Sequence, residues 1–352
     1  AGTGQDIVFD HASTNFLSEV TVSSARDVSL NDLNALTVHG QISRDLTLTA
    51  GQGVTLGTTS VGRNLNVTSA GLVDRDAQAI TVQGTTTLSA GTSDVVLDNL
   101  THDFVGAVTV TQAHDIVLRD ANAMTFAGTA TGNADVYATT QIYLGVTHIT
   151  GLLKAHGNFT MTGDVVADHI DLTSINFLDM AGYSATATGT TGYIQVTAQG
   201  DITLGKLRAI NGSVSVQTNN GRILDGLQTE ERTIITGGDL SLSASQGDLT
   251  LKLWGNAGSG PFAADSTAGT IDLVAGSINS LSVPGNITIL GAGGTNTFGG
   301  VIHSNNDLTL NFGTAGITMT STASLSAVNN LSIQSSSGNL ALSQISAGQN
   351  VT

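Results

Sequence analysis

The 352-residue chain has no cysteine, only two prolines and an aromatic fraction of 4%, although 40% of its residues are hydrophobic. Without cysteine, no disulfide framework holds the fold together. With so few aromatic residues, the core has to be filled by aliphatic side chains. The composition matches neither a disordered nor a collagenous chain. The sequence therefore predicts a protein that folds by aliphatic packing alone.

Basic residues are also scarce, since 11 Lys and Arg stand against 27 Asp and Glu and give a formal net charge of −16. Nucleic-acid binding depends on many Lys and Arg contacts to phosphates, which excludes nucleic acid as a partner. No apolar run reaches the roughly 18 residues of a membrane-spanning helix, and no signal-peptide pattern opens the chain. We expect no membrane span. The lack of cysteine suits an exported bacterial surface protein.

A short repeat organises the chain. Its pattern is Asp or Asn, then Leu, Ile or Val, then any residue, then Leu, Ile or Val. Neighbouring copies are about 10, 20 or 40 residues apart, which is typical of a repeat of about 20 residues with a weaker half-period. The pattern starts at Asp27, Asp45, Asn64, Asp94, Asp115, Asp201, Asp239, Asp248, Asn286, Asp307, Asn330 and Asn339.

Each copy is typical of a short strand. In the segment from Asp45 to Leu48 both Leu side chains point to one face and Thr47 points to the other, as the period of two requires. The leading Asp or Asn suits the turn before the strand, because its side chain can accept hydrogen bonds from nearby backbone N–H groups. Helical signals are nearly absent, with Thr, Val, Ile, Ser and Gly dominating over Glu and Lys.

Strands this short cannot bury an apolar face alone, whereas stacked coils can. The sequence therefore predicts an all-β fold, a right-handed parallel β-helix (β-solenoid) with roughly 20-residue coils. It is expected to run as one continuous segment over residues 1–352, cut from a longer chain because neither end has a polar capping unit. An array of β-sandwiches is the alternative architecture, but it would bring longer strands, more aromatic core residues and inter-domain Pro.

Three stretches interrupt the strand rhythm and are expected to project as loops, near 177–193, 224–236 and 254–268. The second holds two of the three Glu, and the third joins the only Trp to a Gly/Ser run. Insertions in solenoids gather on one flank, and an exposed aromatic ring suits sugar stacking. The candidate ligand-contact residues are therefore Gln228, Glu230, Glu231, Arg232, Trp254, Asn256 and Phe262.

Four histidines stand next to an aspartate in sequence, at His11, His102, His114 and His169. Neighbours in a strand point to opposite faces, so such a pair can share a metal ion only in a turn. Solvated turn residues are the favoured interpretation. No catalytic, cofactor or metal site is predicted, although turn aspartates are able to hold calcium weakly.

Two other functions stay open. Some parallel β-helices degrade polysaccharides with clustered carboxylates and basic residues, and Asp164, Asp168 and Asp171 with Lys154 and His156 form the densest such group. Outward Thr pairs two residues apart, such as Thr47 with Thr49, are the pattern of ice-binding β-solenoids. The β-propensity of Thr explains these pairs more simply.

Several stretches resemble the central repeats of filamentous-haemagglutinin-type exoproteins of Gram-negative bacteria. The resemblance covers nearly the whole chain and is carried by residues 44–57, 238–244 and 339–342. It implies a β-helical fibre exported through a partner outer-membrane pore by two-partner secretion. The family's secretion domain carries Asn-Pro motifs, whereas the two prolines here, Pro261 and Pro284, follow Gly and Val. Any secretion domain therefore lies outside this segment.

Together these observations predict a structural or adhesive segment of a secreted bacterial surface fibre, without enzymatic activity. Its partners would be the outer-membrane secretion pore and a host-surface or glycan receptor.

Overall fold

A computed structural model describes most of the chain, and its contacts group into two compact units, Ala1–Gly163 and Asp164–Thr352. We call them the N-terminal and the C-terminal unit. The described residues are 2, 4–74, 78–226, 234–236, 240–244, 249–254, 263–264, 278–283, 287–290, 295–298, 301–304, 307–311, 316–319 and 321–352.

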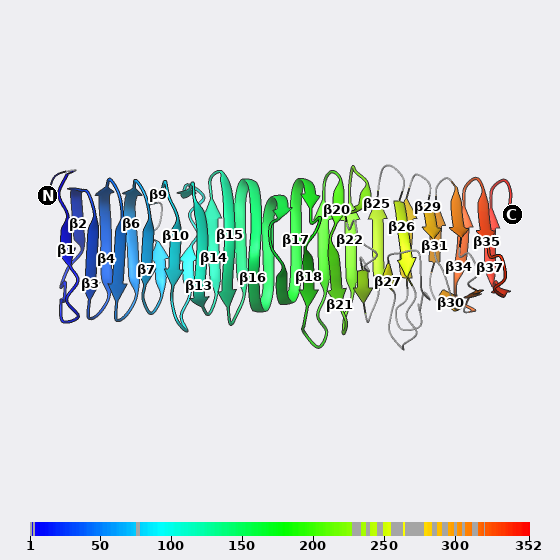
Figure 1. The fold of residues 1–352 in the computed structure, drawn as a ribbon, viewed down its shortest axis with the longest axis horizontal. Helices are drawn as coiled ribbons and strands as arrows, with labels where there is room; N and C mark the ends of the chain where they lie inside the picture. The colour runs from blue at the N-terminus through cyan, green and yellow to red at the C-terminus, as the bar shows by residue number, and fades with distance from the viewer. Residues whose placement is uncertain are drawn as a thin grey trace. The chain divides into compact units, whose positions relative to one another are not determined.

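The N-terminal unit consists of short strands joined by tight turns, drawn from blue to green in Figure 1. Its last strand, β16, bends around more than one side of a coil, since its first residues pair with β14 and later ones with β15. The strands are β1 (Ile7–Phe9), β2 (Val20–Ala25), β3 (Val28–Asp32), β4 (Leu36–Ile42), β5 (Leu46–Ala50), β6 (Val54–Val61), β7 (Leu65–Thr68), β8 (Leu72–Asp74), β9 (Ile80–Val82), β10 (Thr86–Ser89), β11 (Val95–Leu97), β12 (Asp103–Phe104), β13 (Ala107–Ala113), β14 (Ile116–Asp120), β15 (Ala123–Ala130) and β16 (Ala134–Met161).

These strands stack in parallel, each on its equivalent in the next coil. Ile7 pairs with Val28, Val28 with Leu46 and Leu46 with Leu65, so successive members of this column are 21, 18 and 19 residues apart. This spacing is one coil. A second column runs in the same way through Leu36, Val54, Leu72, Val95, Ile116 and Ala134.

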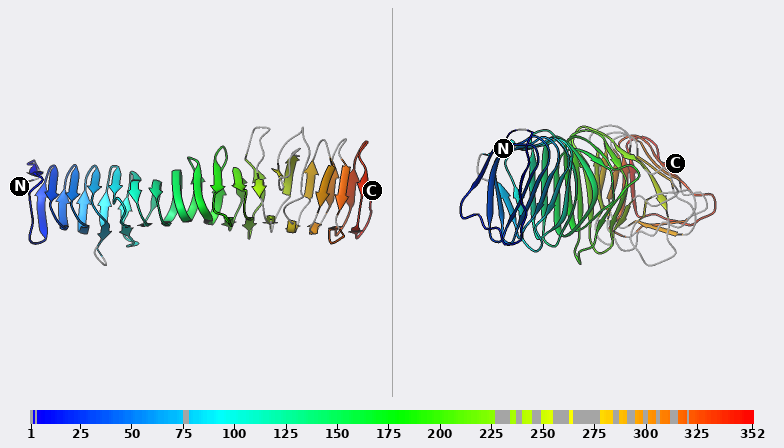
Figure 2. Two further views of the ribbon diagram at one scale, coloured as in Figure 1. Left: turned by 90° about the horizontal axis from the view of Figure 1, so that it is seen from below. Right: turned by 60° about the vertical axis from the view of Figure 1, so that its left-hand side comes forward.

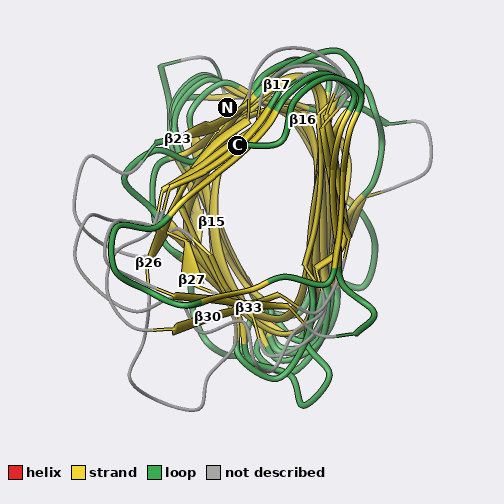
Figure 3. Cartoon of the chain, turned by 90° about the vertical axis from the view of Figure 1, so that its right-hand side faces the viewer, coloured by secondary structure: helices red, strands yellow, loops and turns green. Residues whose placement is uncertain are grey.

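The core is the inside of the coils. In β5 the two Leu side chains are buried while Thr47 and Thr49 face outward, because successive strand residues point to opposite faces. Viewed along the stack, the strands form the walls of the coils and the turns form the corners (Figure 3). Aliphatic side chains dominate this interior. The largest fully buried side chains are nevertheless aromatic, those of Phe104, Phe126 and Phe159.

The C-terminal unit is also built of stacked parallel strands, drawn from green to red in Figure 2. Ile170 pairs with Ile194, and Ile194 with Val214, both in parallel. Its strands are β17 (Val165–Asp179), β18 (Ser184–Ala187), β19 (Ile194–Ala198), β20 (Ile202–Leu204), β21 (Lys206–Ala209), β22 (Val214–Thr218), β23 (Ile223–Asp225), β24 (Ile234–Thr236), β25 (Leu240–Ala244), β26 (Leu249–Trp254), β27 (Ala263–Ala264), β28 (Ile278–Val283), β29 (Ile287–Leu290), β30 (Thr295–Phe298), β31 (Val301–Ser304), β32 (Leu308–Asn311), β33 (Gly316–Met319), β34 (Ser324–Ala327), β35 (Leu331–Gln334), β36 (Leu340–Ala341) and β37 (Gln344–Ala347).

One short strand departs from the parallel order. β27 pairs antiparallel with both β24 and β26, and lies inside the stretch 254–268 that the sequence predicts as an excursion. The stretch 177–193 contains the end of β17 and all of β18, so its projecting parts are confined to the turns before and after β18. In the stretch 224–236, residues 227–233 lie outside the described part of the chain.

The prediction of an all-β parallel β-solenoid with roughly 20-residue coils is confirmed. Every regular element among the described residues is a strand. None of these residues forms a helix long and apolar enough to cross a bilayer. That the two units form one continuous solenoid stays a prediction.

Candidate functional site

In many of the described repeats, the aspartate or asparagine at the start bonds to the next coil. The Oδ1 atom of Asp27 accepts a hydrogen bond from the backbone N–H of Asp45 at 3.1 Å, and Asp45 accepts one from Asn64 at the same distance. Asn64 in turn accepts the N–H of Thr85 at 3.0 Å. The sequence predicts a local turn bond instead. That prediction is wrong because stacking places the equivalent N–H of the next coil beside each side chain.

The same bond recurs along both units. Each acceptor is an Asp or Asn at the start of a strand, and each donor is a backbone N–H 18 to 23 residues later. The remaining pairs are Asp6 with Asp27, Asp94 with Asp115, Asp115 with Asn133, Asn133 with Leu152, Asp164 with Ser184, Asp201 with Arg222, and Asp307 with Asn330. These carboxylates and amides are therefore part of the scaffold.

In several coils an arginine adds an ion pair to this bond. Arg26 donates from Nε and Nη2 to the two carboxylate oxygens of Asp6, at 2.8 and 2.6 Å. Arg63 bonds both oxygens of Asp45, and Arg222 pairs with Asp201 at 2.6 Å. We call such a pair between coils an Arg–Asp staple. Hydrogen bonds from the guanidinium are the main cause that lowers the pKa of the aspartate in each staple.

Substitutions at Asp45 should separate the two contacts. Asp45→Asn keeps an oxygen for the N–H of Asn64 but loses the ion pair with Arg63, and partly exposed ion pairs contribute little. Asp45→Ala removes both, so the N–H loses its partner and the free energy of unfolding should fall by about 1 kcal/mol. Urea unfolding followed by circular dichroism measures both variants. If Asp45→Asn and Asp45→Ala lower the free energy of unfolding equally, the bond to the backbone N–H of Asn64 does not contribute to stability.

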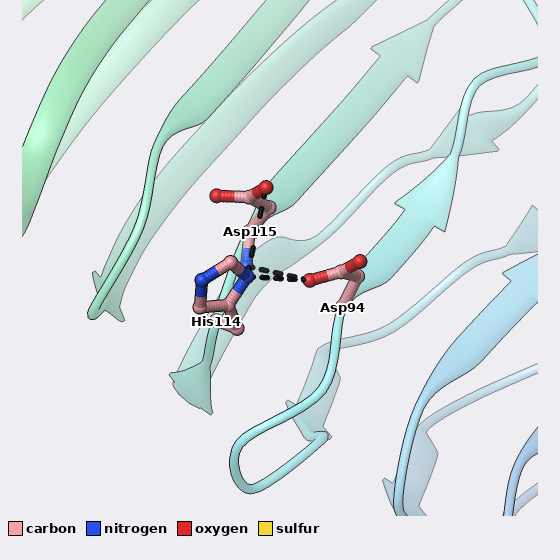
Figure 4. A group of neighbouring side chains, drawn as sticks. All are labelled: Asp94, His114 and Asp115. Atoms are coloured by element: carbon pink, nitrogen blue, oxygen red, sulfur yellow. Dashed lines mark hydrogen bonds and ion pairs between the residues drawn. The ribbon is translucent and has the colours of Figure 1, made fainter.

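Asp94, His114 and Asp115 form the one group of three metal-ligand side chains within the described residues, with ligand atoms all within 4.8 Å of one another. His114 Nδ1 lies 3.0 Å from Asp94 Oδ1 and 3.6 Å from Asp115 Oδ2 (Figure 4). Both residues of the His114-Asp115 pair lie in the bend before β14, so the turn that a shared ion requires is present.

This group nevertheless repeats the staple. His114 precedes Asp115 and bonds Asp94 of the preceding coil, just as Arg26 precedes Asp27 and bonds Asp6. Asp94 also accepts the N–H of Asp115 at 3.0 Å, which is the scaffold bond of the repeat. The imidazole therefore takes the place of a guanidinium, and the carboxylates are already engaged.

His114→Arg tests this interpretation. A guanidinium at this position can bond Asp94 through two nitrogens, so we expect an unchanged or slightly higher melting temperature. The melting temperature is measured by circular dichroism with and without Zn²⁺. A concentration of about 1 mM is high enough to occupy even a weak site. A wild-type protein that Zn²⁺ stabilises, and a variant that it does not, would contradict the staple and establish a metal site.

His102 of the N-terminal unit is a buried histidine that pairs with an aspartate. Its ring is fully buried, and its Nε2 lies 2.9 Å from Oδ2 of Asp74, whose side chain is 5% exposed. The backbone N–H of Ile80 donates to Nδ1 at 3.0 Å. The ring therefore joins the end of β8 to the start of β9. Burial lowers the pKa of His102, although the charge of Asp74 opposes this shift.

Asp120 is a buried carboxylate with a different role. It accepts the N–H of Phe104 at 2.8 Å and that of Asn122 at 2.6 Å, so it closes the turn after β14. Asp32 makes the equivalent bonds to Phe16 and Asn34. Burial raises the pKa of Asp120, against the two backbone bonds. Neither Asp32 nor Asp120 was predicted to have this role, although both carry the signal Asp-x-Asn at the end of a strand.

The prediction of solvated turn histidines is right for two of the four His–Asp neighbours. His11 and His114 are exposed in turns. It is wrong for His102, whose ring is buried, and for His169, which lies in β17 and stacks on Tyr193 at a ring distance of 4.7 Å.

The predicted ligand-contact residues are not tested by the structure. Gln228, Glu230, Glu231, Arg232, Asn256 and Phe262 lie outside the described residues. Trp254 ends β26, and only its backbone is described.

The carboxylates of the alternative enzyme site have hydrogen-bond partners. Asp164 accepts bonds from the N–H and the hydroxyl of Ser184, at 2.8 and 2.9 Å. Asp168 accepts one from Thr188 at 3.0 Å. The basic members, Lys154 and His156, lie in β16 of the other unit, where His156 stacks on Tyr137. The only triad of metal-ligand side chains found within the described residues does not include these carboxylates.

Comparison with known proteins yields one match. Residues 43–111 are similar to a family described as repeats of unknown function (DUF5649). No curated protein and no solved structure matches the chain. The matched stretch contains Asp45, Asn64 and Asp94, so the family match falls on coils whose Asp and Asn side chains bond from one coil to the next.

Proposed function

We propose that this chain is a structural and adhesive segment of a large secreted fibre on the bacterial cell surface. In this proposal it reaches the surface through an outer-membrane pore, as two-partner secretion would provide, and it is not an enzyme. The stacked coils serve as a scaffold that carries binding surfaces away from the cell.

The observation that carries the proposal is the use of the polar side chains. In the described part of both units, the repeat carboxylates bond backbone N–H groups of the next coil. A catalytic site needs acidic and basic groups that converge and are free to exchange protons. Here such groups support the stack instead, which favours a mechanical role over a chemical one.

Repetition also favours adhesion. Coils that repeat about every 20 residues present the same outward positions again and again. Weak contacts repeated along one surface add up to strong attachment when they bind simultaneously. A scaffold of this kind needs no single deep pocket.

Adhesion can be measured with beads coated with the purified chain. We expect more beads to remain on bacterial or epithelial cell layers under flow than beads coated with albumin. The same protein, incubated with neutral and acidic polysaccharides, should release no reducing ends and no unsaturated products. Retention equal to albumin would contradict the adhesive role, and product release would replace it with polysaccharide degradation.

A further inference from the structure

One sheet of the N-terminal unit presents a regular, uncharged outer surface. It is formed by β3, β5, β7, β10 and β13, which pair in register. We call its outward positions the threonine face. Its first column is Ser29, Thr47, Asn66, Thr87 and Thr109. Its second column, two residues further along the strands, is Asn31, Thr49, Thr68 and Ser89.

The face has no charge, although the chain as a whole has a net charge of −16. The five strands contain a single charged residue, Asp32, which is buried and bonded to two backbone N–H groups. The outward positions of β14 and β16, by contrast, hold the ion pair of Arg119 with Asp135. Charge is therefore present on the outside of another sheet of this unit, although β2, β4, β6 and β9 share the lack of Asp, Glu, Lys and Arg.

Most polar side chains of the face have no hydrogen-bond partner among the described residues. Within the described residues, Asn31 is the one member whose side chain hydrogen-bonds to the protein, at 3.3 Å to the carbonyl of Asp10. All nine side chains are half-buried or exposed. Hydroxyl and amide groups both donate and accept hydrogen bonds. The face is thus a grid of unpaired donors and acceptors, with rows about 4.8 Å apart.

We propose that the threonine face binds a neutral polysaccharide, and this proposal rests on the adhesive function given above. A neutral glycan offers the same hydroxyl donors and acceptors and no charge that would need a counter-ion. An acidic glycan is repelled by the negative chain, and the arginines beside the face, Arg26, Arg44 and Arg63, already pair with aspartates. Each row contributes a weak contact, so binding should increase with glycan length.

Affinity electrophoresis in native gels tests the proposal, with dextran, hydroxyethyl cellulose or polygalacturonate in the gel. We expect at least one of the two neutral glucans to retard the protein, and short oligomers of that glucan to compete much more weakly than long ones. Polygalacturonate should not retard it. Retardation by neither neutral glucan, or by polygalacturonate alone, would overturn the proposal.

Matched variants locate the surface. Thr47→Val with Thr87→Val removes two hydroxyls of the face at nearly constant shape, and should weaken binding about fivefold or more. Thr37→Val with Thr81→Val removes two half-buried outward hydroxyls from β4 and β9, and should leave binding unchanged. Equal weakening in both variants, or none in the first, would overturn the proposal.

The bead assay separates this proposal from the adhesive function itself. If beads coated with the Thr47→Val, Thr87→Val variant adhere as well as wild-type beads, adhesion stands and the threonine face is not its surface. If only ice growth is changed by the wild-type protein, and neither glucan retards it, the face is assigned to ice and the glycan proposal fails.

Discussion

Leu48→Asp should unfold the coils around it. Leu48 is 1% exposed and pairs in register with Leu30 below and Val67 above, both also buried. Removing a buried Leu side chain costs about 2 to 5 kcal/mol, and an unpaired carboxylate in an aliphatic interior adds to that loss. We therefore expect the free energy of unfolding to fall by more than about 4 kcal/mol.

The loss should spread to neighbouring coils. Each coil of a solenoid is stabilised by the coils on either side, so a defect weakens the interfaces with both. Thermal unfolding by circular dichroism should show a lower melting temperature and a broader transition. Limited proteolysis at room temperature should produce new cleavages near β5. Thr47→Asp is the control, because it places the same charge one residue away on the outer face, where the effect should stay within about 0.5 kcal/mol. Similar melts for the two variants would contradict the inward orientation of Leu48.

The inward and outward sides of the strands could be predicted from the sequence because a strand alternates with a period of two. The segment from Asp45 to Leu48 shows this directly, since both Leu are buried and Thr47 is not. The repeat spacing likewise predicted which strands stack. Local composition and periodicity determine these features, so a single sequence contains them.

Contacts that depend on the stack could not be predicted in the same way. Asp45 and Arg63 are 18 residues apart, and only the length of the intervening coil brings them together. His102 and His114 each stand next to an aspartate in sequence, yet one is buried and the other exposed. Their environments depend on which coil lies beside them. The threonine face was visible only as isolated Thr pairs until the register aligned Ser29, Thr47 and Asn66.

His102→Ala should destabilise the N-terminal unit strongly at pH 7. The substitution removes the bonds to Asp74 and to the N–H of Ile80, and leaves the carboxylate of Asp74 without this partner in a site that is nearly closed to solvent. Leaving a buried carboxylate without its hydrogen-bond donor costs about 1 to 3 kcal/mol or more, and the cavity left by the imidazole adds to that loss. His114→Ala is the matched control, because His114 also contacts a carboxylate but its side chain is 53% exposed. Urea unfolding at pH 7 should show little change for that variant.

Acid should weaken the wild-type protein through the same residue. Because the N–H of Ile80 donates to Nδ1, the ring is neutral and Nε2 carries its proton toward Asp74. Burial lowers the pKa of His102 below 6.5 in the folded state, whereas the unfolded chain binds a proton near 6.5. As the pH falls through 6.5, the unfolded state therefore binds more protons and stability decreases, by at most about 1.4 kcal/mol per pH unit for one group. The decrease ends below the folded pKa.

The pH dependence of unfolding, measured from pH 7.5 to 5, separates His102 from the staples. The aspartates of the Arg–Asp staples have lowered pKa values, so their contribution is complete above about 3.8 and is lost only at lower pH. His102→Ala should thus be less stable than wild type at pH 7 but should lose less further stability on acidification. Two results would show that the buried imidazole does not cause the loss of stability in acid. One is a wild-type protein whose stability is constant over this range, and the other is a His102→Ala variant whose stability depends on pH as steeply as that of wild type. Protonation of Nδ1 puts a second hydrogen against the N–H of Ile80, so the bond that holds the start of β9 is the first that acid should break.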